Sequence, residues 1–368
     1  MPEATRVQSP WLVKCLVWDL DGTLWDGTLL EGDDIRPREG AAQVIAELDA
    51  RGILQSVCSR NDHEDAWQRL RGLGLDHYFV YPQIGFGRKS DAVRRIADRL
   101  QFDLGTIALI DDQPAERAEV LFHLPQVRCY AADEMNSLPG MAVFRPPVVT
   151  ADARRRRQLY RAGQERDAER AAFSGSDEEF LRSLALTMRV IRASNEDLGR
   201  AAELTVRTSQ MNATGLHYRE DQLRVLRADP SQEILVVSLT DRFGPYGTVG
   251  VVLLGRHPTV WHLKLLATSC RVMPCGAGAV ILNWLIGQAS RVGVHVVADF
   301  RATSRNRIAE LAYRFAGLGE SLCACQTAIA PASHPDIQRF HTDSAPETVS
   351  TTIRVEGLEL SRLAYEPG

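Results

Sequence analysis

Between Lys14 and about Tyr130, short apolar runs alternate with stretches whose apolar residues recur at helical spacing. This alternation predicts repeated strand–helix units, and therefore a parallel sheet covered by helices. We expect strands at residues 15–18, 53–58, 78–80, 107–110 and 127–130, and helices at 41–50, 62–73, 90–100 and 115–121. Ligands of such sheets bind beyond the carboxyl ends of the strands, so polar residues at those ends are the first candidates for a site.

The second half of the chain follows a different pattern, typical of a mixed α/β domain with an antiparallel meander. The sequence DRFGPYG at 241–247 supplies Pro and Gly between two apolar runs and predicts a hairpin turn. We expect helices at residues 195–208, 277–291 and 304–316, and strands at 234–239, 248–254, 261–268, 294–299 and 351–355.

Prolines separate the two patterns, at Pro139, Pro146 and Pro147. We therefore predict one α/β domain at residues 1–145, a linker and connecting helix at 146–180, a second domain at 181–330 and a C-terminal extension at 331–368. The connecting helix contains the arginine run 154–157. A phosphate-binding role for this run is an alternative, but an exposed helical face is the simpler interpretation.

Composition limits the function classes. The 368 residues are 45% hydrophobic and 24% charged, which excludes collagen-like, coiled-coil and disordered classes. The formal net charge of −4 creates no strong field, so neither nucleic acid nor an acidic membrane is an expected partner. No apolar run has membrane-spanning length and no signal peptide is evident, so we expect a cytoplasmic protein. Seven widely spread cysteines fit reduced thiols better than a disulfide framework.

Polar residues of one chemical set follow the strands predicted in the first half. They are Asp19 and Asp21 after the first strand, Ser59 after the second, Lys89 before a helix, and Asp111 and Asp112 after the fourth strand. Phosphoryl transfer through an aspartyl-phosphate needs these groups: one carboxylate attacks phosphorus, a second donates a proton, a hydroxyl and an ammonium hold phosphoryl oxygens, and further carboxylates fix Mg²⁺. An Asp-x-Asp pair alone is weak evidence, but the ordered set is specific.

In this ordered set the chain resembles the haloacid dehalogenase (HAD) superfamily. The resemblance implies that Asp19 is the nucleophile and Asp21 the general acid and base, and that Ser59 and Lys89 contact phosphate. It also implies Mg²⁺ ligands from Asp19, Asp21 (through its carbonyl), and Asp111 or Asp112. Asp21 and Ser59 stand 38 positions apart and Ser59 and Lys89 stand 30 positions apart, which leaves no room for a folded cap in either gap, so we expect an open site.

A cysteine is the candidate nucleophile of the second half. Cys270 ends an apolar run and precedes the helix predicted from Ala277, with Arg271 beside it. A nearby helix N-terminus and an arginine both favour a thiolate, which could carry an acyl group. A buried, unreactive cysteine is the alternative.

From about residue 14 to 318 the chain resembles the FkbH-like family, in which a HAD-type half is fused to a half like the GNAT acetyltransferases. The resemblance rests on RTSQMN at 207–212, the DRFGPYG turn, SCRV at 269–272 and the spacing of Asn306, Tyr313 and Gly317. It implies glyceryl loading in polyketide-type secondary metabolism. There, 1,3-bisphosphoglycerate loses phosphate while its acyl group passes through the enzyme cysteine, here Cys270, to the phosphopantetheine thiol of an acyl carrier protein.

Several positions depart from the family pattern. The acetyltransferase-type phosphate loop would begin at Arg271, a candidate phosphate contact, but Pro274 replaces its first glycine and supplies no N–H. Gly22, Asp26 and the segment 83–90 also differ from glyceryl-loading members, so a donor other than bisphosphoglycerate is an alternative.

Three further sets of residues are weaker candidates. His262 is a candidate base and Tyr313 a candidate acid, although both residue types are more often packed side chains at such positions. The spacings among Cys270, Cys275, Cys323 and Cys325 match no usual zinc site, so we interpret the last three as ordinary cysteines.

The sequence therefore predicts an α/β protein in which a HAD-like Rossmannoid sheet with a minimal cap is joined to a GNAT-like domain. The expected activity is Mg²⁺-dependent removal of phosphate from a small phosphorylated acyl donor, with transfer of the acyl group to an acyl carrier protein. A phosphatase without acyl transfer and a non-catalytic carrier-protein docking module are the alternatives. The complete carboxylate, serine and lysine set argues against the docking module, because a scaffold needs none of these groups.

Overall fold

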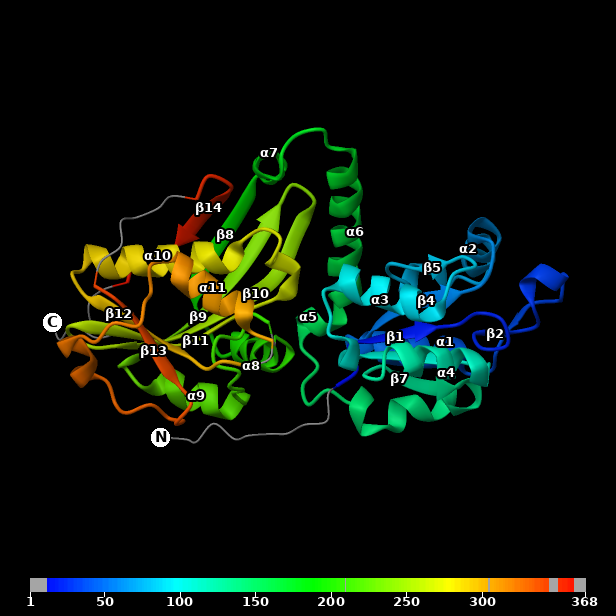
Figure 1. Ribbon diagram of the computed structural model, residues 1–368, viewed down its shortest axis with the longest axis horizontal. Coiled ribbons are helices and arrows are strands. Elements are labelled where there is room, and N and C mark those ends of the chain that lie inside the picture. Colours follow the sequence, from blue (N-terminus) through cyan, green and yellow to red (C-terminus); the bar gives the residue numbers. More distant parts are fainter. Residues whose placement is uncertain (1–11, 209, 304, 344–349, 361–368) are drawn as a thin grey trace. The chain divides into compact units, whose positions relative to one another are not determined.

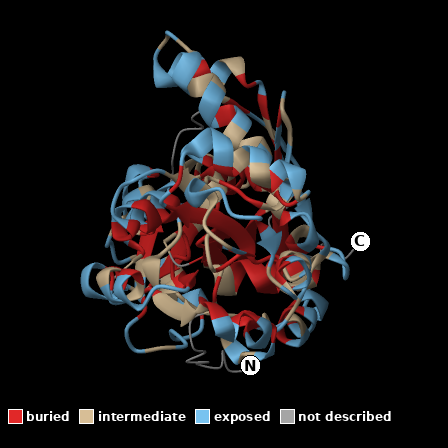
Figure 2. Ribbon diagram, turned by 90° about the vertical axis from the view of Figure 1, so that its right-hand side faces the viewer, coloured by how far each residue is buried: buried red, intermediate tan, exposed pale blue. Residues whose placement is uncertain are grey.

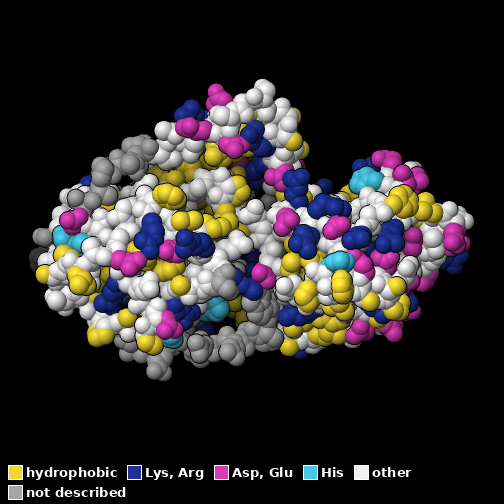
Figure 3. Space-filling model, in the orientation of Figure 1, with side chains coloured by type: hydrophobic (Ala, Val, Ile, Leu, Met, Phe, Trp, Pro, Cys, Tyr) yellow, Lys and Arg dark blue, Asp and Glu magenta, His cyan; other side chains and the backbone are white. Residues whose placement is uncertain are grey.

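The computed structural model describes residues 12–208, 210–303, 305–343 and 350–360 (Figure 1). The chain divides into two compact units, of which the first ends at Ala168 and the second begins at Glu169. The predicted α/β class is confirmed, since the first unit holds a parallel sheet and the second a mixed sheet. Within the described residues, no helix combines the length and the apolar character that crossing a membrane requires. On the face shown in Figure 3, basic and acidic side chains are interspersed.

The first unit is built on a five-stranded parallel sheet with the order β5-β4-β1-β6-β7. Its strands are β1 (Cys15–Trp18), β4 (Leu54–Ser59), β5 (Gln83–Ile84), β6 (Ile107–Asp111) and β7 (Arg128–Ala131). The strand predicted at 78–80 is wrong. Phe79 makes one isolated bridge to Gln55, and the chain then turns at Tyr81, whose φ of 49° lies in the left-handed region. Pairing with β4 resumes only at β5.

Helices cover both faces of this sheet, and this follows from the alternation of buried side chains along the strands. Leu16 and Trp18 of β1 pack on one side with α1 and α2, whereas Cys15 and Val17 pack on the other with α3 and α4. Figure 2 shows the buried strands inside and the exposed outer faces of the helices. The helices are α1 (Ala41–Ala50), α2 (His63–Gly72), α3 (Lys89–Leu100) and α4 (Pro114–His123).

The first unit adds only small elements to the sheet and its four covering helices, among the residues that the structure describes. Between β1 and α1 the chain forms a hairpin of two short strands, β2 (Trp25–Asp26) and β3 (Arg36–Pro37). After β7, a 3₁₀ segment (Ala132–Gly140) packs against α1. Two helices, α5 (Ala151–Arg154) and α6 (Arg156–Ala172), then lead out of the unit.

The expected exposure of the arginine run is wrong for two of its members. Arg156 is 6% exposed, and its Nη1 donates to the Gly52 carbonyl at 2.7 Å. Arg157 pairs through Nε with Asp49 at 3.0 Å and lies over the Tyr78 ring. These cations therefore fasten the start of α6 to the first unit.

The second unit is built on a seven-stranded mixed sheet with the order β13-β12-β11-β10-β9-β8-β14. β9, β10 and β11 form the predicted antiparallel meander, and β8 adds a further antiparallel strand beside β9, while β14 lies parallel to β8 and β12 parallel to β11 (Figure 1). The strands are β8 (Leu186–Arg192), β9 (Gln232–Asp241), β10 (Gly244–Arg256), β11 (Val260–Thr268), β12 (His295–Phe300), β13 (Gln338–Thr342) and β14 (Ile353–Gly357).

Two pairs of helices cover the two faces of this sheet. α10 and α11 pack on one face with residues such as Leu263 and Ala298, and α8 and α9 pack on the other with Val251 and Leu265. The helices of this unit are α7 (Asp177–Ser183), α8 (Asp197–Arg207), α9 (Glu220–Ala228), α10 (Ala277–Arg291) and α11 (Arg307–Phe315).

β11 and β12 diverge, and the chain fills the space between them. They pair only from Val260 to Leu263 of β11. Beyond this point, residues 211–213 take the place of the partner: Ala213 N donates to the Leu266 carbonyl and Thr268 N to the Met211 carbonyl, both at 3.1 Å. On its other side, the Ala213 carbonyl accepts from Arg301 N at 3.1 Å. The segment thus acts as a short wedge between the two strands.

Several predictions for this half need correction. The hairpin turn is tighter than the seven residues of DRFGPYG, because β9 runs to Asp241 and β10 already begins at Gly244. β8, α9 and β13 were not predicted, since each is short or carries polar residues on one face. Ser209 of the RTSQMN stretch, Ser304 of the last predicted helix, and residues 344–349 and 361–368 of the extension lie outside the described residues.

Candidate active site

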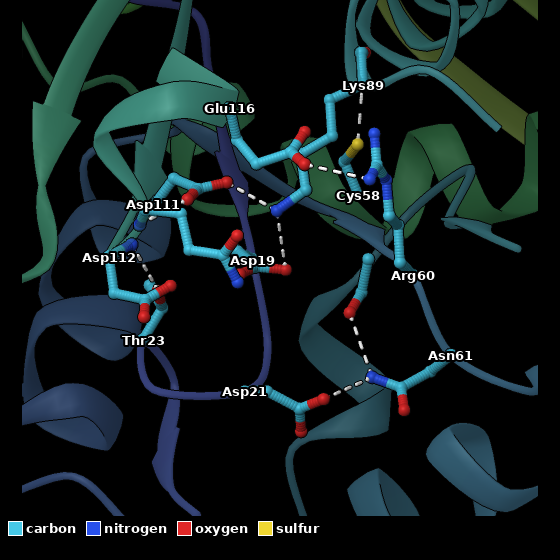
Figure 4. Close-up of polar contacts among 12 residues, drawn as sticks. Asp19, Asp21, Thr23, Cys58, Arg60, Asn61, Lys89, Asp111, Asp112 and Glu116 are labelled. Atoms are coloured by element: carbon cyan, nitrogen blue, oxygen red, sulfur yellow. Dashed lines mark hydrogen bonds and ion pairs between the residues drawn. The ribbon is translucent and has the colours of Figure 1, made fainter. Parts of the chain in front are cut away.

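The parallel sheet brings the predicted polar set of the first unit to one edge (Figure 4). Asp19 follows β1, Ser59 is the last residue of β4, and Asp111 is the last residue of β6. Because β4 and β6 flank β1 and run parallel to it, their carboxyl ends meet at the same edge. Lys89 joins them from the first turn of α3.

Lys89 lies between two buried carboxylates. Its Nζ is 2.9 Å from Asp19 Oδ1 and also contacts Asp111 Oδ2, and all three side chains are at most 5% exposed. Burial alone lowers the pKa of Lys89, but Asp19 and Asp111 together outweigh it, and the net pKa is raised. Burial raises the pKa of Asp19 to about 7, although Lys89 acts in the opposite direction. Two carboxylates share one ammonium, so the group carries one excess negative charge once Asp19 is ionised.

Asp112 is held close to the turn that follows Asp19. Its backbone N donates to Thr23 Oγ1 at 2.9 Å, and its Oδ1 accepts from the same hydroxyl at 3.5 Å. Gly22 allows this approach, because it has a φ of +64° and a Cβ at this position would lie 2.7 Å from Asp112 Oδ2. Thr23 was not among the predicted site residues, although it follows the Asp-x-Asp-Gly sequence directly.

The residues at this edge fit a magnesium ion. Asp19, Asp111 and Asp112 each offer a carboxylate oxygen, and these atoms lie within 4.8 Å of one another. Mg²⁺ takes oxygen ligands at about 2.0–2.1 Å, so opposite ligands of one ion lie about 4.1 Å apart. The excess negative charge described above also favours a cation. The Asp21 side chain does not belong to this group.

Asp21 instead faces three N–H donors on the other side of the turn. Its Oδ1 accepts from Trp25 Nε1 at 2.7 Å and from Leu29 N at 3.1 Å, and its Oδ2 accepts from Asn61 Nδ2 at 2.9 Å. The same Asn61 nitrogen donates to Ser59 Oγ at 3.0 Å. Through these two hydrogen bonds, Asn61, which is 1% exposed, links the predicted acid Asp21 to the predicted phosphate contact Ser59.

Sequence reasoning missed Asn61, although a signal for it existed. It stands two residues beyond Ser59, as Asp21 stands two residues beyond Asp19, so both come three residues after the ends of the predicted strands 15–18 and 53–58. Its Oδ1 is buried and accepts no hydrogen bond from the described part of the chain. This oxygen is thus available for a donor of a ligand.

A cavity of about 130 Å³ opens beside Ser59 and Lys89. Its lining includes three arginines, Arg60, Arg88 and Arg95, together with the glycine-rich loop 85–88. Arg60 pairs with Glu116 at 3.0 Å, and Arg95 donates to Gln83 at 2.8 Å. Guanidinium groups recognise phosphate and carboxylate oxygens, so this cavity suits a substrate with a second anionic group.

In the second unit, Cys270 lies beyond the end of β11, where it begins the 3₁₀ helix η6 (Cys270–Val272). It is half-buried, and Arg271 beside it directs its Nε to Ser269 Oγ at 3.3 Å. The predicted helix α10 does begin at Ala277, but this is seven residues after the cysteine. The N-terminus of α10 therefore does not directly stabilise a Cys270 thiolate, contrary to the expectation from the sequence.

The structure does not bring His262 to Cys270. His262 lies near the start of β11, and a strand rises about 3.3 Å per residue, so its distance to the strand end at Thr268 is roughly 20 Å. It is 5% exposed, and its Nε2 is 2.8 Å from Asp299 Oδ1. Tyr313 is fully buried and packs edge-on against the rings of Phe300 and Phe340, as expected of a packed side chain rather than an acid.

No family model matches the chain, and no curated protein matches it. Among solved structures it is similar to the N-terminal part of a Bacteroides fragilis protein that contains a phosphatase domain complexed with Mg, at 27% identity and a TM-score of 0.30. This similarity spans 36% of this chain and only 40% of the Bacteroides chain.

Two further solved structures are similar at lower identity. A HAD-superfamily hydrolase from Ehrlichia chaffeensis is 12% identical over 33% of this chain and 87% of its own, with a TM-score of 0.28. Spermidine N-acetyltransferase from Vibrio cholerae, solved with CoA and spermine, is 14% identical over 42% of this chain and 94% of its own, with a TM-score of 0.32. The similar structures thus include both phosphatase and acetyltransferase types.

Proposed function

We propose that this chain is a Mg²⁺-dependent enzyme that removes phosphate from a small phosphorylated acyl donor and passes the acyl group through Cys270 to the phosphopantetheine thiol of an acyl carrier protein. The observation that supports it most is the buried pairing of Lys89 with both Asp19 and Asp111. Burying three charged groups costs folding free energy, and a docking module gains nothing from that cost. The pairing therefore favours catalysis over docking.

In the phosphatase step, a carboxylate oxygen of Asp19 attacks the phosphorus of a phosphate monoester, and the P–O bond to the leaving alcohol breaks. Asp21 gives a proton to the leaving oxygen and takes one from the water that then hydrolyses the aspartyl-phosphate. Ser59 and Lys89 hold the phosphoryl oxygens. Mg²⁺, held by Asp19 with Asp111 or Asp112, would offset the negative charge of the transferred group.

The acyl step imposes a condition on the donor. If Asp19 attacked the phosphorus of an acyl phosphate, the acyl group would leave as a carboxylate and could no longer form a thioester. Cys270 must therefore displace the acyl phosphate itself: its thiolate attacks the carbonyl carbon, the C–O bond breaks, and inorganic phosphate leaves. The Asp19 reaction then acts on a second phosphate of the same donor, as 1,3-bisphosphoglycerate would provide. The arginine-lined cavity beside Lys89 supports a donor with two anionic groups.

Transfer to the carrier completes the sequence. The phosphopantetheine thiolate attacks the Cys270 thioester, and the Cys270 thiolate leaves, so that one thioester replaces another at nearly equal free energy. In the alternative without acyl transfer, the first unit alone releases phosphate from a small or carrier-bound intermediate. The two proposals differ only in whether Cys270 becomes acylated.

Intact-protein mass spectrometry distinguishes these proposals. The enzyme and a cognate carrier protein are incubated with Mg²⁺ and 1,3-bisphosphoglycerate, and we expect a glyceryl adduct on both proteins. Asp19→Asn should give an adduct heavier by one phosphoryl group, because Cys270 still reacts while the second phosphate remains. Cys270→Ala should give no adduct on either protein. If phosphate is released and wild-type enzyme carries no adduct, the phosphatase alternative holds.

A further inference from the structure

Two cysteines and two histidines of the second unit converge at the β13 end of its sheet. They are His295 at the start of β12, Cys323 and Cys325 in the connection that follows α11, and His341 of β13. Each offers one ligand atom, and the four atoms lie within 4.8 Å of one another. Residues separated by up to 46 positions along the chain thus meet at one point.

The distances within this cluster are a few tenths of an ångström shorter than those between the ligands of a zinc centre. His295 Nδ1 is 3.4 Å from Cys323 Sγ and 3.1 Å from His341 Nε2. In a tetrahedral zinc site with Zn–S near 2.3 Å and Zn–N near 2.0–2.1 Å, neighbouring S and N ligands lie about 3.6 Å apart and two N ligands about 3.4 Å apart. One ring nitrogen carries at most one proton, so a hydrogen bond accounts for only one of the two contacts of His295 Nδ1.

A second set of contacts orients His341. Its Nδ1 is 3.0 Å from Ser321 Oγ, so an Nδ1–H that donates to this oxygen leaves the Nε2 lone pair directed at the cluster. The Ser321 carbonyl in turn accepts from Gln326 Nε2 at 2.9 Å. The backbone of His341 is also fixed, because its N–H donates to the Gly319 carbonyl at 2.7 Å and its carbonyl accepts from Gly319 N at 3.0 Å.

The cluster lies where the fold has little else to hold the chain. Between α11 and β13 the described chain contains one short 3₁₀ helix, η7 (Ala324–Ala328). A small apolar cluster of Val260, Val297 and Ile329 packs beneath it, and Leu322 is 98% exposed. So irregular a connection needs another constraint to keep a single conformation.

We propose that His295, Cys323, Cys325 and His341 bind one Zn²⁺ ion as a structural site. Two thiolates and two imidazoles are the ligand set that Zn²⁺ prefers, in contrast to the carboxylates of the first unit, which suit Mg²⁺. On binding, each cysteine releases one proton to solvent, and the resulting centre has no net charge. All four positions are filled by side chains, so the ion links the connection to β12 and β13 and takes no part in catalysis.

Metal analysis of the full-length protein tests this proposal. Protein expressed with zinc and purified without chelator should carry one zinc per chain. Double substitution Cys323→Ser/Cys325→Ser should remove it. Two controls, Cys129→Ser and Asp111→Asn, should keep it, which separates this site from thiols elsewhere and from the carboxylate group of the first unit. Zinc that persists in the double variant, or that disappears in Asp111→Asn, would overturn the proposal.

A measurement on the wild-type protein guards against a variant that fails to fold. Zinc is removed with a thiol-safe chelator and replaced by Co²⁺, which should give thiolate-to-cobalt charge-transfer bands and the intense visible bands of tetrahedral coordination. Ser321→Ala should still bind the metal but about 10- to 100-fold more weakly. The proposal fails if Co²⁺ gives no thiolate band, or if mass spectrometry shows Cys323 and Cys325 joined as a disulfide in freshly purified protein.

Discussion

The two units arrange their candidate reactive residues in opposite ways. In the first unit, Asp19 and Asp111 stand at the ends of neighbouring strands and both pair with Lys89, and Ser59, at the end of a third strand, lines the same cavity as Lys89. In the second unit, Cys270 lies beyond the end of β11, and His262 near the start of the same strand is roughly 20 Å from that end, since each strand residue adds about 3.3 Å. Residues a few positions apart in one strand are far apart in space because the strand is extended. Residues at the ends of neighbouring parallel strands are close in space although they are far apart in sequence.

The largest expected effect tests the group formed by Asp19, Lys89 and Asp111 in the first unit. Asp19→Asn removes the attacking carboxylate, so phosphate release should fall on the order of 10⁴- to 10⁶-fold, as when other covalent nucleophiles are removed. Release of inorganic phosphate from a phosphate monoester is the measurement. Asp26→Asn, an exposed carboxylate of the β2–β3 hairpin, is the matched control and should keep the wild-type rate. Wild-type release by Asp19→Asn would remove the nucleophile assignment.

The second prediction sharpens the contrast within β11. Cys270→Ala should abolish transfer to the carrier protein and leave release from a phosphate monoester unchanged, because the two chemistries use different units. His262→Gln should keep acyl transfer, since this histidine pairs with Asp299 and lies far from the strand end. Carrier acylation followed by mass spectrometry gives both results. Loss of transfer in His262→Gln with a normal folding transition would contradict the separation of these two residues.

The third prediction concerns how much Lys89 contributes to the free energy of unfolding by neutralising the buried carboxylates. Lys89→Met leaves Asp19 and Asp111 buried together without their ammonium, so the first unit should lose about 3–5 kcal/mol of unfolding free energy. Arg36→Met removes an exposed ion pair with Asp34 and should cost about 0–1 kcal/mol. Urea unfolding followed by a probe in the first unit compares the two variants. Equal stability of both would mean that the charges around Lys89 are not coupled.

The smallest effect concerns Asn61, a positioning residue. Asn61→Ala removes one of the three donors to Asp21 and the donor to Ser59, so kcat for phosphate release should fall about 10-fold, or about 1.4 kcal/mol. KM should change less, because Lys89, the proposed phosphate contact, is unchanged. Asn195→Ala, an exposed asparagine of the second unit, serves as control. An unchanged kcat in Asn61→Ala would show that Trp25 and Leu29 orient Asp21 without it.

Much of the first unit could be predicted from sequence because its signals are local. Apolar runs such as 107–110 are buried on both faces and match the observed strand to within a residue. The polar residues that end these runs then follow from the rule for parallel sheets. The strand at 78–80 failed because Tyr81 adopts a positive φ that its residue type does not announce.

The second unit shows why other features could not be predicted. The Cys323-x-Cys325 spacing matches no usual zinc sequence. Its histidine partners are distant in sequence, since His295 stands 28 positions before Cys323 and His341 stands 16 positions after Cys325. Only the pairing of β12 with β13 brings the histidines together, and β13 itself was not predicted. The orientation of Asp21 is a similar case, because a side-chain rotamer has no signature in a single sequence.

The wedge of residues 211–213 constrains how an acceptor can reach the end of β11. Its backbone occupies the Leu266 carbonyl and the Thr268 N–H on the edge of β11 beyond Leu263, so neither group is open to a pantetheine arm. Under the proposed function, such an arm would gain no hydrogen bond from these two groups on its way to Cys270. Short synthetic thiols should therefore also accept the acyl group from Cys270.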